Sequence, residues 1–234
     1  MEQSAVTVCI TSFNRFDLLK QTIDSFNKLN TYFIKRIIII EDSVNLEMKN
    51  KISQEYGTKI DLIFNDQNIG QALSIDKMYQ TVDTEYIFHS EDDYIYSGNA
   101  NFIKDSIDIL EERKDVHQIW IRHINDYAIN NININSVLEQ EELLTVNNIK
   151  YRMIKSPHGG GWCGFSWNPG LRRTDDYNKM FPNGYGEFII PEYKHSGVHI
   201  ESFCNNNAMK RGYRAALLIN GACNNLGTRN STYK

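Results

Sequence analysis

The stretch YIFHSEDDYIY, residues 86–96, places three consecutive acids directly after an apolar run. Carboxylates repel one another and favour water, so Glu91, Asp92 and Asp93 need a reason to follow a run that would be buried as a strand. Two interpretations are open. The acids form a polar turn that closes the strand, or they hold a cation at the strand's end. The rest of the chain decides between them.

Strands and helices alternate on both sides of this stretch. Leu19, Ile23 and Phe26 recur at spacings of four and three, which predicts one apolar face of a helix over residues 15–30, with Asn14 as its N-cap. The run 37–40 is apolar at every position, as in a strand covered on both faces. Further strands are predicted at 5–13, 59–66, 85–90 and 117–123, and further helices at 70–82 and 100–113. This alternation predicts an α/β fold with a doubly wound, Rossmann-like sheet.

Polar clusters end three of the predicted strands, at residues 11–15, 41–43 and 91–93. In doubly wound sheets, ligands bind beyond the carboxyl ends of the strands. A chain turn explains one such cluster easily, but three at one edge favour a shared ligand site. The acidic triplet is therefore interpreted as part of a binding site.

The second half of the chain is less regular. Residues 124–148 are rich in Asn, Ile and Glu and are predicted to form a long loop or lid, followed by a strand at 149–156. A helix is predicted at 199–213 and a strand at 214–219. Between them, the segment HGGGWCGFSW suits a sugar pocket, because glycines let a backbone approach a ligand and a tryptophan can stack on a sugar ring. Gly161 and Trp162 are the candidates for binding the sugar or the acceptor. Alternatively, Trp162 and Trp167 are buried core residues at a tight strand corner.

Composition excludes several classes of protein. The 234 residues suit one domain, and a net charge of −4 argues against a nucleic-acid partner, which needs a basic surface. No apolar run approaches the roughly 18 residues of a transmembrane segment, and the N-terminus lacks the basic region of a signal peptide. The four cysteines are far apart and form no C-x-x-C pair, which argues against a thiol zinc site. Buried, reduced thiols predict a cytoplasmic protein, or one carried in the cytosol of a host.

Several of these segments together resemble the family 2-like glycosyltransferases of the GT-A fold. The segment at residues 6–26 looks like their opening strand, turn and helix, and IIIIEDS looks like their second strand. NDQNIGQALSIDKMY resembles their N-x-G segment, and FHSEDDYIY resembles their acidic D-x-D metal motif. The likeness covers residues 5–95 and returns in HIESFCNNNAMKRGYR, similar to a family helix that carries the catalytic acid.

The resemblance implies a GT-A-type mixed sheet flanked by helices, in one domain with two subregions. Residues 1–95 would bind the nucleotide sugar, and residues 96–234 would bind the acceptor. A divalent cation, Mn²⁺ or Mg²⁺, would be held directly by Asp93 and through water by Asp92, while Glu91 would face the ribose. The residues expected to bind the donor are Thr11, Phe13, Asn14, Arg15, Asp42, Asn68, Gly70, Asp76 and Glu91. Glu201 is the expected general base.

The chain departs from the family pattern at three places. The usual Ala-Arg-Asn triplet is replaced by Ser74, Ile75 and Asp76, so its arginine is missing. Only Glu201 remains of the usual Glu-Asp pair. Asn225 stands where the family often has a histidine near the C-terminus, which leaves a third protein ligand to the metal open.

The predicted function is metal-dependent glycan biosynthesis. A hexose or N-acetylhexosamine would pass from a nucleotide diphosphate sugar, with a UDP-sugar expected, to a glycan or other hydroxyl acceptor, with inversion. A non-catalytic sugar-nucleotide-binding protein remains an alternative, because two family residues are missing. A sugar nucleotidyltransferase is a weaker one, because TSFNRF lacks the glycine-rich basic loop such enzymes place after their first strand.

Overall fold

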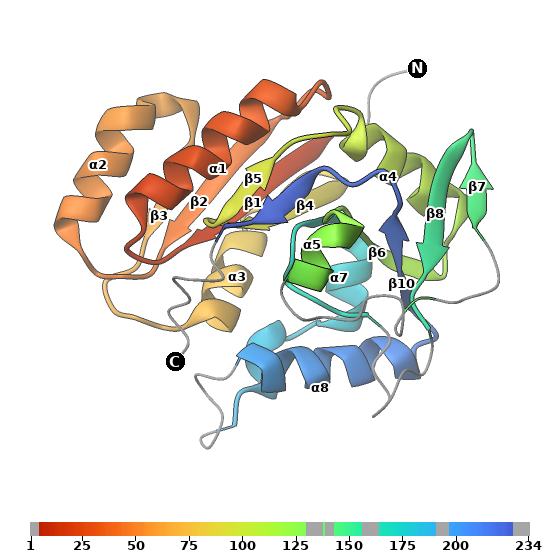
Figure 1. Cartoon of the computed structure of the whole chain (residues 1–234). Coiled ribbons are helices and arrows are strands. Elements are labelled where there is room, and N and C mark those ends of the chain that lie inside the picture. The colour runs from red at the N-terminus through yellow and green to blue at the C-terminus, as the bar shows by residue number, and fades with distance from the viewer. Residues whose placement is uncertain (1–4, 130–137, 139–142, 156–163, 191–196, 227–234) are drawn as a thin grey trace.

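The computed structural model describes residues 5–129, 138, 143–155, 164–190 and 197–226, and its centre is a nine-stranded mixed sheet (Figure 1). The strands lie in the order β3-β2-β1-β4-β9-β6-β10-β8-β7. Their bounds are β1 (Val6–Ser12), β2 (Arg36–Glu41), β3 (Asp61–Phe64), β4 (Tyr86–Glu91), β6 (Val116–Trp120), β7 (Leu144–Val146), β8 (Ile149–Met153), β9 (Gly170–Arg173) and β10 (Arg214–Leu218). A small second sheet pairs β5 (Tyr94–Tyr96) with β11 (Cys223–Asn225).

The sheet is parallel where the nucleotide motifs lie and antiparallel farther along. β1 pairs in parallel with β2 and with β4, and β2 pairs in parallel with β3. β9 runs antiparallel between β4 and β6, and β8 runs antiparallel to β10. The predicted α/β class with a mixed, helix-flanked sheet is confirmed.

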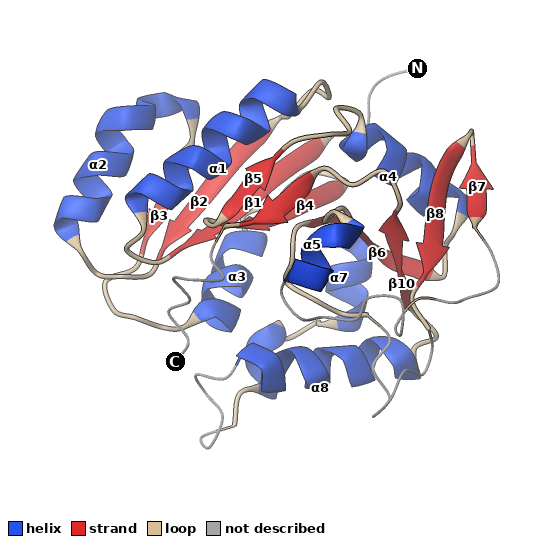
Figure 2. Ribbon diagram, in the orientation of Figure 1, coloured by secondary structure: helices blue, strands red, loops and turns tan. Residues whose placement is uncertain are grey.

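Helices cover both faces of the sheet (Figure 2). Their bounds are α1 (Phe16–Leu29), α2 (Leu46–Tyr56), α3 (Gln71–Tyr79), α4 (Phe102–Glu112), α5 (Ile124–Ile129), α7 (Thr174–Met180) and α8 (Gly197–Lys210), with short 3₁₀ turns η1 (Gly57–Lys59) and η2 (Tyr185–Phe188). Alternate residues of β1 face opposite sides, as strand geometry requires. Val6, Val8 and Ile10 pack in the cluster formed with α1, α2 and α4, whereas Cys9 packs in the cluster formed with α3, α7 and α8.

Two predictions about elements are corrected. Residues 124–148 were predicted as a loop, but their described ends form α5 and β7, and β7 pairs with β8. Asn14 is not the N-cap of α1. The N-cap is Arg15. Asn14 lies in the turn before the helix with φ 57°, and its backbone N–H donates to Glu41 Oε1 at 3.0 Å.

The described residues bear on two of the expectations from composition, those about membrane-spanning segments and about the cysteines. Every helix among them is too short or too polar to cross a lipid bilayer. Cys9, Cys204 and Cys223 are buried, free thiols, and burial raises the pKa of each above its usual value. Cys163 lies outside the described residues.

A buried carboxylate joins α3 to η2. Asp76 accepts hydrogen bonds from the backbone N–H groups of Tyr185 and Gly186, each at 2.8 Å, and from the Tyr177 hydroxyl at 2.8 Å. Gly184 precedes this turn with φ 78°, and a Cβ there would lie 2.5 Å from Asp76 Oδ2. The turn can therefore close on Asp76 only if residue 184 is a glycine.

Gly184→Ala should destabilise the fold more than Gly57→Ala. Both glycines have a positive φ, so each alanine carries a strain of about 1–2 kcal/mol, but a Cβ at Gly57 meets no atom within 4 Å. Overpacking against Asp76 adds about 1–3 kcal/mol at Gly184. Urea unfolding of both variants measures the difference in the free energy of unfolding. Equal losses at the two positions would contradict the role given to Asp76.

Candidate functional site

The three polar clusters meet at one edge of the sheet. Ser12 at the end of β1 is in register with Glu41 at the end of β2, and Thr11 is in register with Glu91 at the end of β4. The carboxyl ends of three neighbouring parallel strands thus bring residues 11–15, 41–43 and 91–93 together. The expectation that the three polar clusters share one edge of the sheet is confirmed. The side chains of the candidate site lie on this edge.

Glu41 fixes the turn after β1. Its fully buried carboxylate accepts hydrogen bonds from Ser12 Oγ at 2.7 Å and from the backbone N–H groups of Asn14 at 3.0 Å and Ser43 at 3.1 Å. These donors satisfy both carboxylate oxygens, which makes the burial of the charge tolerable. The sequence prediction singled out Asp42 and passed over Glu41, although both belong to the same acidic pair.

Asp42 holds the loop that leads into α3. Its carboxylate accepts from the side-chain amide of Asn65 at 2.8 Å and from the backbone N–H groups of Ile69 at 3.0 Å and Gly70 at 2.8 Å. Gly70 has φ 85°, the left-handed conformation that the turn into α3 requires. Asn68 is exposed and stabilises the same turn through its Oδ1, which accepts from the Gly70 N–H at 3.1 Å. A carboxylate has about four lone-pair positions, so Asp42 keeps room for one more donor.

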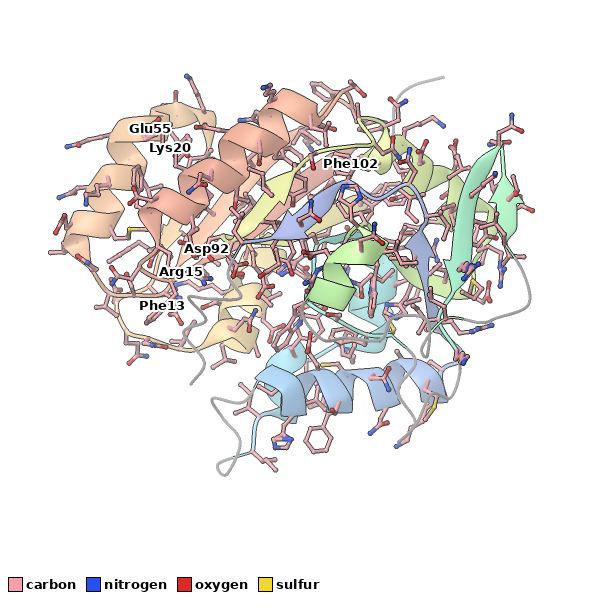
Figure 3. The ribbon with its side chains drawn as sticks, viewed as in Figure 1. Phe13, Arg15, Lys20, Glu55, Asp92 and Phe102 are labelled. Atoms are coloured by element: carbon pink, nitrogen blue, oxygen red, sulfur yellow. The ribbon has the colours of Figure 1, made fainter. Side chains whose placement is uncertain are left out.

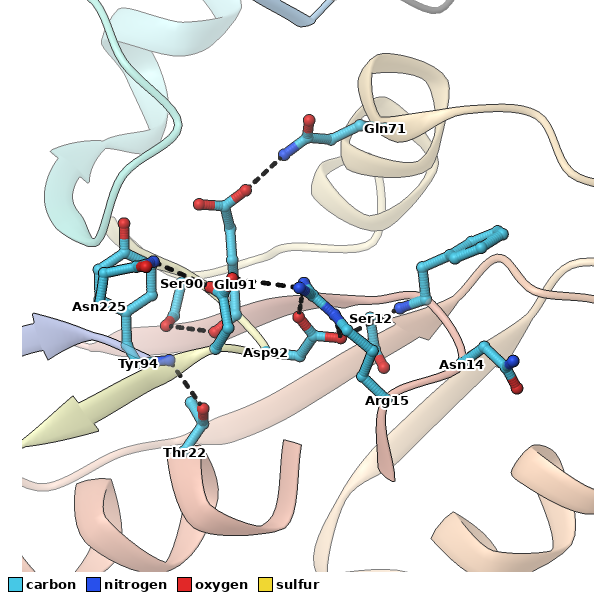
Figure 4. A network of polar contacts seen from close by, with 12 residues as sticks. Ser12, Asn14, Arg15, Thr22, Gln71, Ser90, Glu91, Asp92, Tyr94 and Asn225 are labelled. Carbon is cyan, nitrogen blue, oxygen red and sulfur yellow. Dashed lines mark hydrogen bonds and ion pairs between the residues drawn. The ribbon is translucent and has the colours of Figure 1, made fainter. Parts of the chain in front are cut away.

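Arg15 spans the two aspartates of the acidic triplet, and Figures 3 and 4 show it beside Asp92. Its guanidinium pairs with Asp92 through Nη2, and through Nε at 3.2 Å, while Nη1 lies 3.2 Å from Asp93 Oδ2. The backbone N–H of Phe13 also donates to Asp92, at 3.2 Å. Burial raises the pKa of Asp92 to about 6, and the charge of Arg15 acts in the opposite direction. The turn after β1 is therefore bonded to both aspartates that follow β4.

Asp93 faces the C-terminal part of the described chain. Asn225 on β11 donates its side-chain amide to Asp93 Oδ1 at 3.3 Å, and the Leu226 N–H donates to the Asp93 carbonyl at 2.6 Å. Asn225 is the residue that aligned with the histidine position of the resembled family. The structure places it beside the acidic triplet.

The oxygens of Asp92 and Asp93 suit Mg²⁺ or Mn²⁺, which prefer carboxylates, phosphates and water. In the part of the chain that the structure describes, no group of three or more His, Cys, Asp or Glu side chains is arranged to hold a metal ion. Two carboxylates are compatible with such an ion when a ligand's phosphate oxygens or water complete the coordination. The donor set therefore fits a cation that is bound together with a phosphate ligand.

Glu91 lies between the triplet and the second half of the chain. Its Oε1 accepts from the side-chain amide of Gln71 at 2.8 Å (Figure 4). Burial, followed by the charges of Asp93, Glu201 and Asp92, raises the pKa of Glu91 well above its usual value. The acidic edge is thus electrostatically linked to Glu201 on α8.

Glu201 lies early in α8 and is held by the segment before β9. Its Oε1 accepts from the Trp167 N–H at 2.7 Å and from Ser166 Oγ at 3.2 Å. The pKa of Glu201 is raised above its usual value, because the effect of burial exceeds the opposing effects of the two hydrogen bonds and the charge of Arg172. The sequence prediction did not foresee Ser166 or Arg172, since contacts between distant segments leave no local pattern.

A pocket of about 350 Å³ opens at this edge, within the range of roughly 300–1,000 Å³ that is usual for small-molecule sites. Its walls come from the turn after β1, the loop before α3, the acidic triplet and the start of α8. The lining residues are Thr11, Ser12, Phe13, Arg15, Ile40, Asp42, Asn68, Ile69, Gly70, Gln71, Ala72, Ser74, Glu91, Asp92, Trp167, Ile189, Gly197 and Ile200.

The pocket gathers most of the predicted donor-binding residues. Asn14, Asp76 and Asp93 are not in its lining, and the Asp76 carboxylate is taken up by the turn at η2. Glu201 is not in the lining either, but the adjacent Ile200 is. Gly161 and Trp162 lie outside the described residues. Among the described residues, Trp167 lines the pocket.

Several solved structures share the fold of this chain. TarS from S. aureus, residues 1–349, matches with a TM-score of 0.61 and 13% identity over 95% of this chain and 60% of that one. The mannosyltransferase PcManGT from Pyrobaculum calidifontis, in complex with GDP-Man and Mn²⁺, matches with a TM-score of 0.66 and 12% identity over 96% of this chain and 57% of that one. A TarS complex with UDP-GlcNAc matches with a TM-score of 0.58 and 14% identity, over 94% of this chain and 58% of that one.

The chain spans less than two thirds of the length of these structures. Comparison with curated protein sequences found no match. The family model described as "Glycosyl transferase family 2" matches residues 7–168, which is more than half of the chain. The family and fold predicted from the sequence are confirmed, and with them the assignment to the glycosyltransferases: the chain belongs to glycosyl transferase family 2.

Proposed function

We propose that the chain transfers a hexose or N-acetylhexosamine from a nucleotide diphosphate sugar, with a UDP-sugar as the expected donor, to a hydroxyl group of a glycan or other acceptor. The observation that carries this proposal is the pocket at the carboxyl edge of β1, β2 and β4, with Arg15 and Asp92 in its wall and Asp93 paired with Arg15. The similar structures include one complex with UDP-GlcNAc and one with GDP-Man and Mn²⁺, which supports a nucleotide sugar as the ligand.

The acidic edge would serve the leaving group. Asp92 and Asp93 would hold a Mn²⁺ or Mg²⁺ ion, which supplies positive charge against the diphosphate as the sugar–phosphate bond breaks. Arg15 lies in the pocket wall and offers a guanidinium, a fork that suits phosphate oxygens. Asp42, which fixes the loop before α3, has acceptor capacity left for a base N–H or a ribose hydroxyl. These residues together would position the donor.

Glu201 would act on the acceptor. As the acceptor oxygen attacks the anomeric carbon, its proton passes to the Glu201 carboxylate, the sugar–phosphate bond breaks, and the nucleoside diphosphate leaves with the bonding electrons. Attack from the face opposite the leaving group inverts the anomeric centre. The hydrogen bonds from Trp167 and Ser166 both go to Oε1 and hold the carboxylate in one orientation, so that Oε2 would take the proton.

Asp93→Asn should nearly abolish metal-dependent binding of UDP while leaving the fold intact. An amide keeps the shape and the contact with Asn225 but loses the charge that attracts the cation. Isothermal titration of UDP with and without Mn²⁺ measures the effect, and the exposed Asp66→Asn is the matched control. Unchanged manganese-dependent affinity in a folded Asp93→Asn protein would remove Asp93 from the cation site. The same titration with CTP tests the nucleotidyltransferase alternative.

Glu201→Gln should slow sugar transfer by about a hundred- to ten-thousandfold, which is the usual contribution of a general base. Glutamine keeps an oxygen for the Trp167 N–H but cannot take a proton, so UDP-sugar affinity should stay near that of the wild type. Initial rates and donor affinity are compared with those of Glu112→Gln, a surface substitution on α4. If donor affinity falls as much as the rate, Glu201 is a donor-site or structural residue. If transfer survives in Glu201→Gln, the base is another group.

The pH profile of the wild-type rate gives a second readout. Burial raises the pKa of Glu201, and a base works only when it is deprotonated, so the rate should fall with decreasing pH at a pH above the usual value of 4.5 for glutamate. This acid limb should be absent from the residual activity of Glu201→Gln. An identical limb in both proteins would assign it to another group.

A further inference from the structure

Arg15 is the cation that the structure places between Asp92 and Asp93. The guanidinium contacts both oxygens of Asp92 and one oxygen of Asp93, and the Arg15 side chain is 19% exposed. A charge-assisted, forked contact of this kind is among the stronger hydrogen-bonded pairs in proteins. The two carboxylates that would hold a divalent ion are thus already neutralised in part by a side chain of the protein.

Within the described ranges, no third acidic side chain is placed to hold a metal ion together with these two carboxylates. Among the described residues, no group of three or more potential metal-binding side chains converges on them. A divalent ion that approached the site alone would have to displace a guanidinium and would gain only two carboxylates in return. A nucleotide that approached alone would bring its diphosphate charges close to Asp92 and Glu91 in the pocket wall. Either ligand by itself therefore meets an electrostatic obstacle.

Both obstacles disappear when the two ligands bind together. The diphosphate provides oxygens for the divalent ion and also a new anionic partner for Arg15, which already lines the pocket beside Thr11 and Phe13. The guanidinium would need only to turn about its side-chain bonds, since the backbone of Phe13 and Asn14 is fixed by Asp92 and Glu41. The aspartates then have a cationic partner in both states, Arg15 before binding and the divalent ion afterwards.

We propose that Arg15 is an exchangeable internal counter-ion, which occupies Asp92 and Asp93 in the absence of ligands and moves to the donor diphosphate when the nucleotide and a divalent cation bind together. The inference rests on the proposed function and adds to it the order of binding. It makes the affinity for the metal depend on the nucleotide, and by linkage the affinity for the nucleotide depends equally on the metal.

Manganese binding to the full chain, followed by the electron paramagnetic resonance signal of free Mn²⁺, tests the proposal. Wild-type protein without nucleotide should bind Mn²⁺ weakly, and Arg15→Gln should bind it about tenfold more tightly, because a competing charge a few ångströms away is gone. Arg15→Lys keeps the charge but cannot span both aspartates, so its affinity should fall between the two. Arg113→Gln removes an arginine of a surface pair and should behave as the wild type.

Titrations with UDP give the second half of the test. UDP should raise the Mn²⁺ affinity of the wild type by a larger factor than that of Arg15→Gln, because only the wild type has a side chain to transfer. Equal Mn²⁺ affinities of the wild type and both Arg15 variants without UDP would overturn the inference, and so would an equal effect of UDP on all of them. If the wild type binds no UDP at any Mn²⁺ concentration, the proposed function itself fails. Thermal unfolding shows whether each variant is folded, and Arg15→Lys carries the test if Arg15→Gln is not.

Discussion

A carboxylate can stay buried at the end of a strand only if hydrogen-bond donors reach its oxygens, and this requirement shapes the site. Glu41 draws in the turn after β1, and Asp42 draws in the loop before α3. Asp76 closes η2, and Glu201 fixes the segment before β9. In each case at least one donor is a backbone N–H group, so an acidic side chain sets the path of a loop that would otherwise have many conformations.

The walls of the pocket are those same loops. Because their backbone is held by buried acids, the pocket is largely formed before any ligand binds, which lowers the entropy lost on binding. Arg15 differs from the rest of the edge, since its partners are side-chain carboxylates, and in our proposal its guanidinium turns from them to the diphosphate. A rigid frame with one movable charge suits the proposed function, in which the site would accept and release a nucleoside diphosphate in each turnover.

The sequence predicted those parts of the fold whose pattern is local. The all-apolar run 37–40 and the helix face made by Leu19, Ile23 and Phe26 were enough to place β2 and α1. β9 was missed, because its four residues include a glycine and two arginines, and it is a strand only through pairing with β4 and β6 on either side. Gly170 is required there since a Cβ would lie 2.4 Å from the Ile119 carbonyl oxygen, a contact that no local pattern reveals.

The same division applies to the site. The motifs gathered Arg15, Asp42 and Asp92 correctly around one pocket, because the ends of parallel strands must meet. They could not show that Asp76 points toward η2, more than a hundred residues away in the chain. They also could not show that Arg15 bridges the acids. Tertiary packing decides which donor pairs with which acceptor, and a local sequence pattern carries no information about such pairs.

A crystal structure of the chain grown with Mn²⁺ and UDP tests the central claim most directly, namely that the carboxyl edge of β1, β2 and β4 binds a nucleotide diphosphate through a cation. The predicted result is a diphosphate between Arg15 and the loop before α3, with the ion on Asp93 and the guanidinium moved off Asp92. A nucleotide bound elsewhere, or a diphosphate in the pocket with Mn²⁺ far from Asp92 and Asp93, would contradict it.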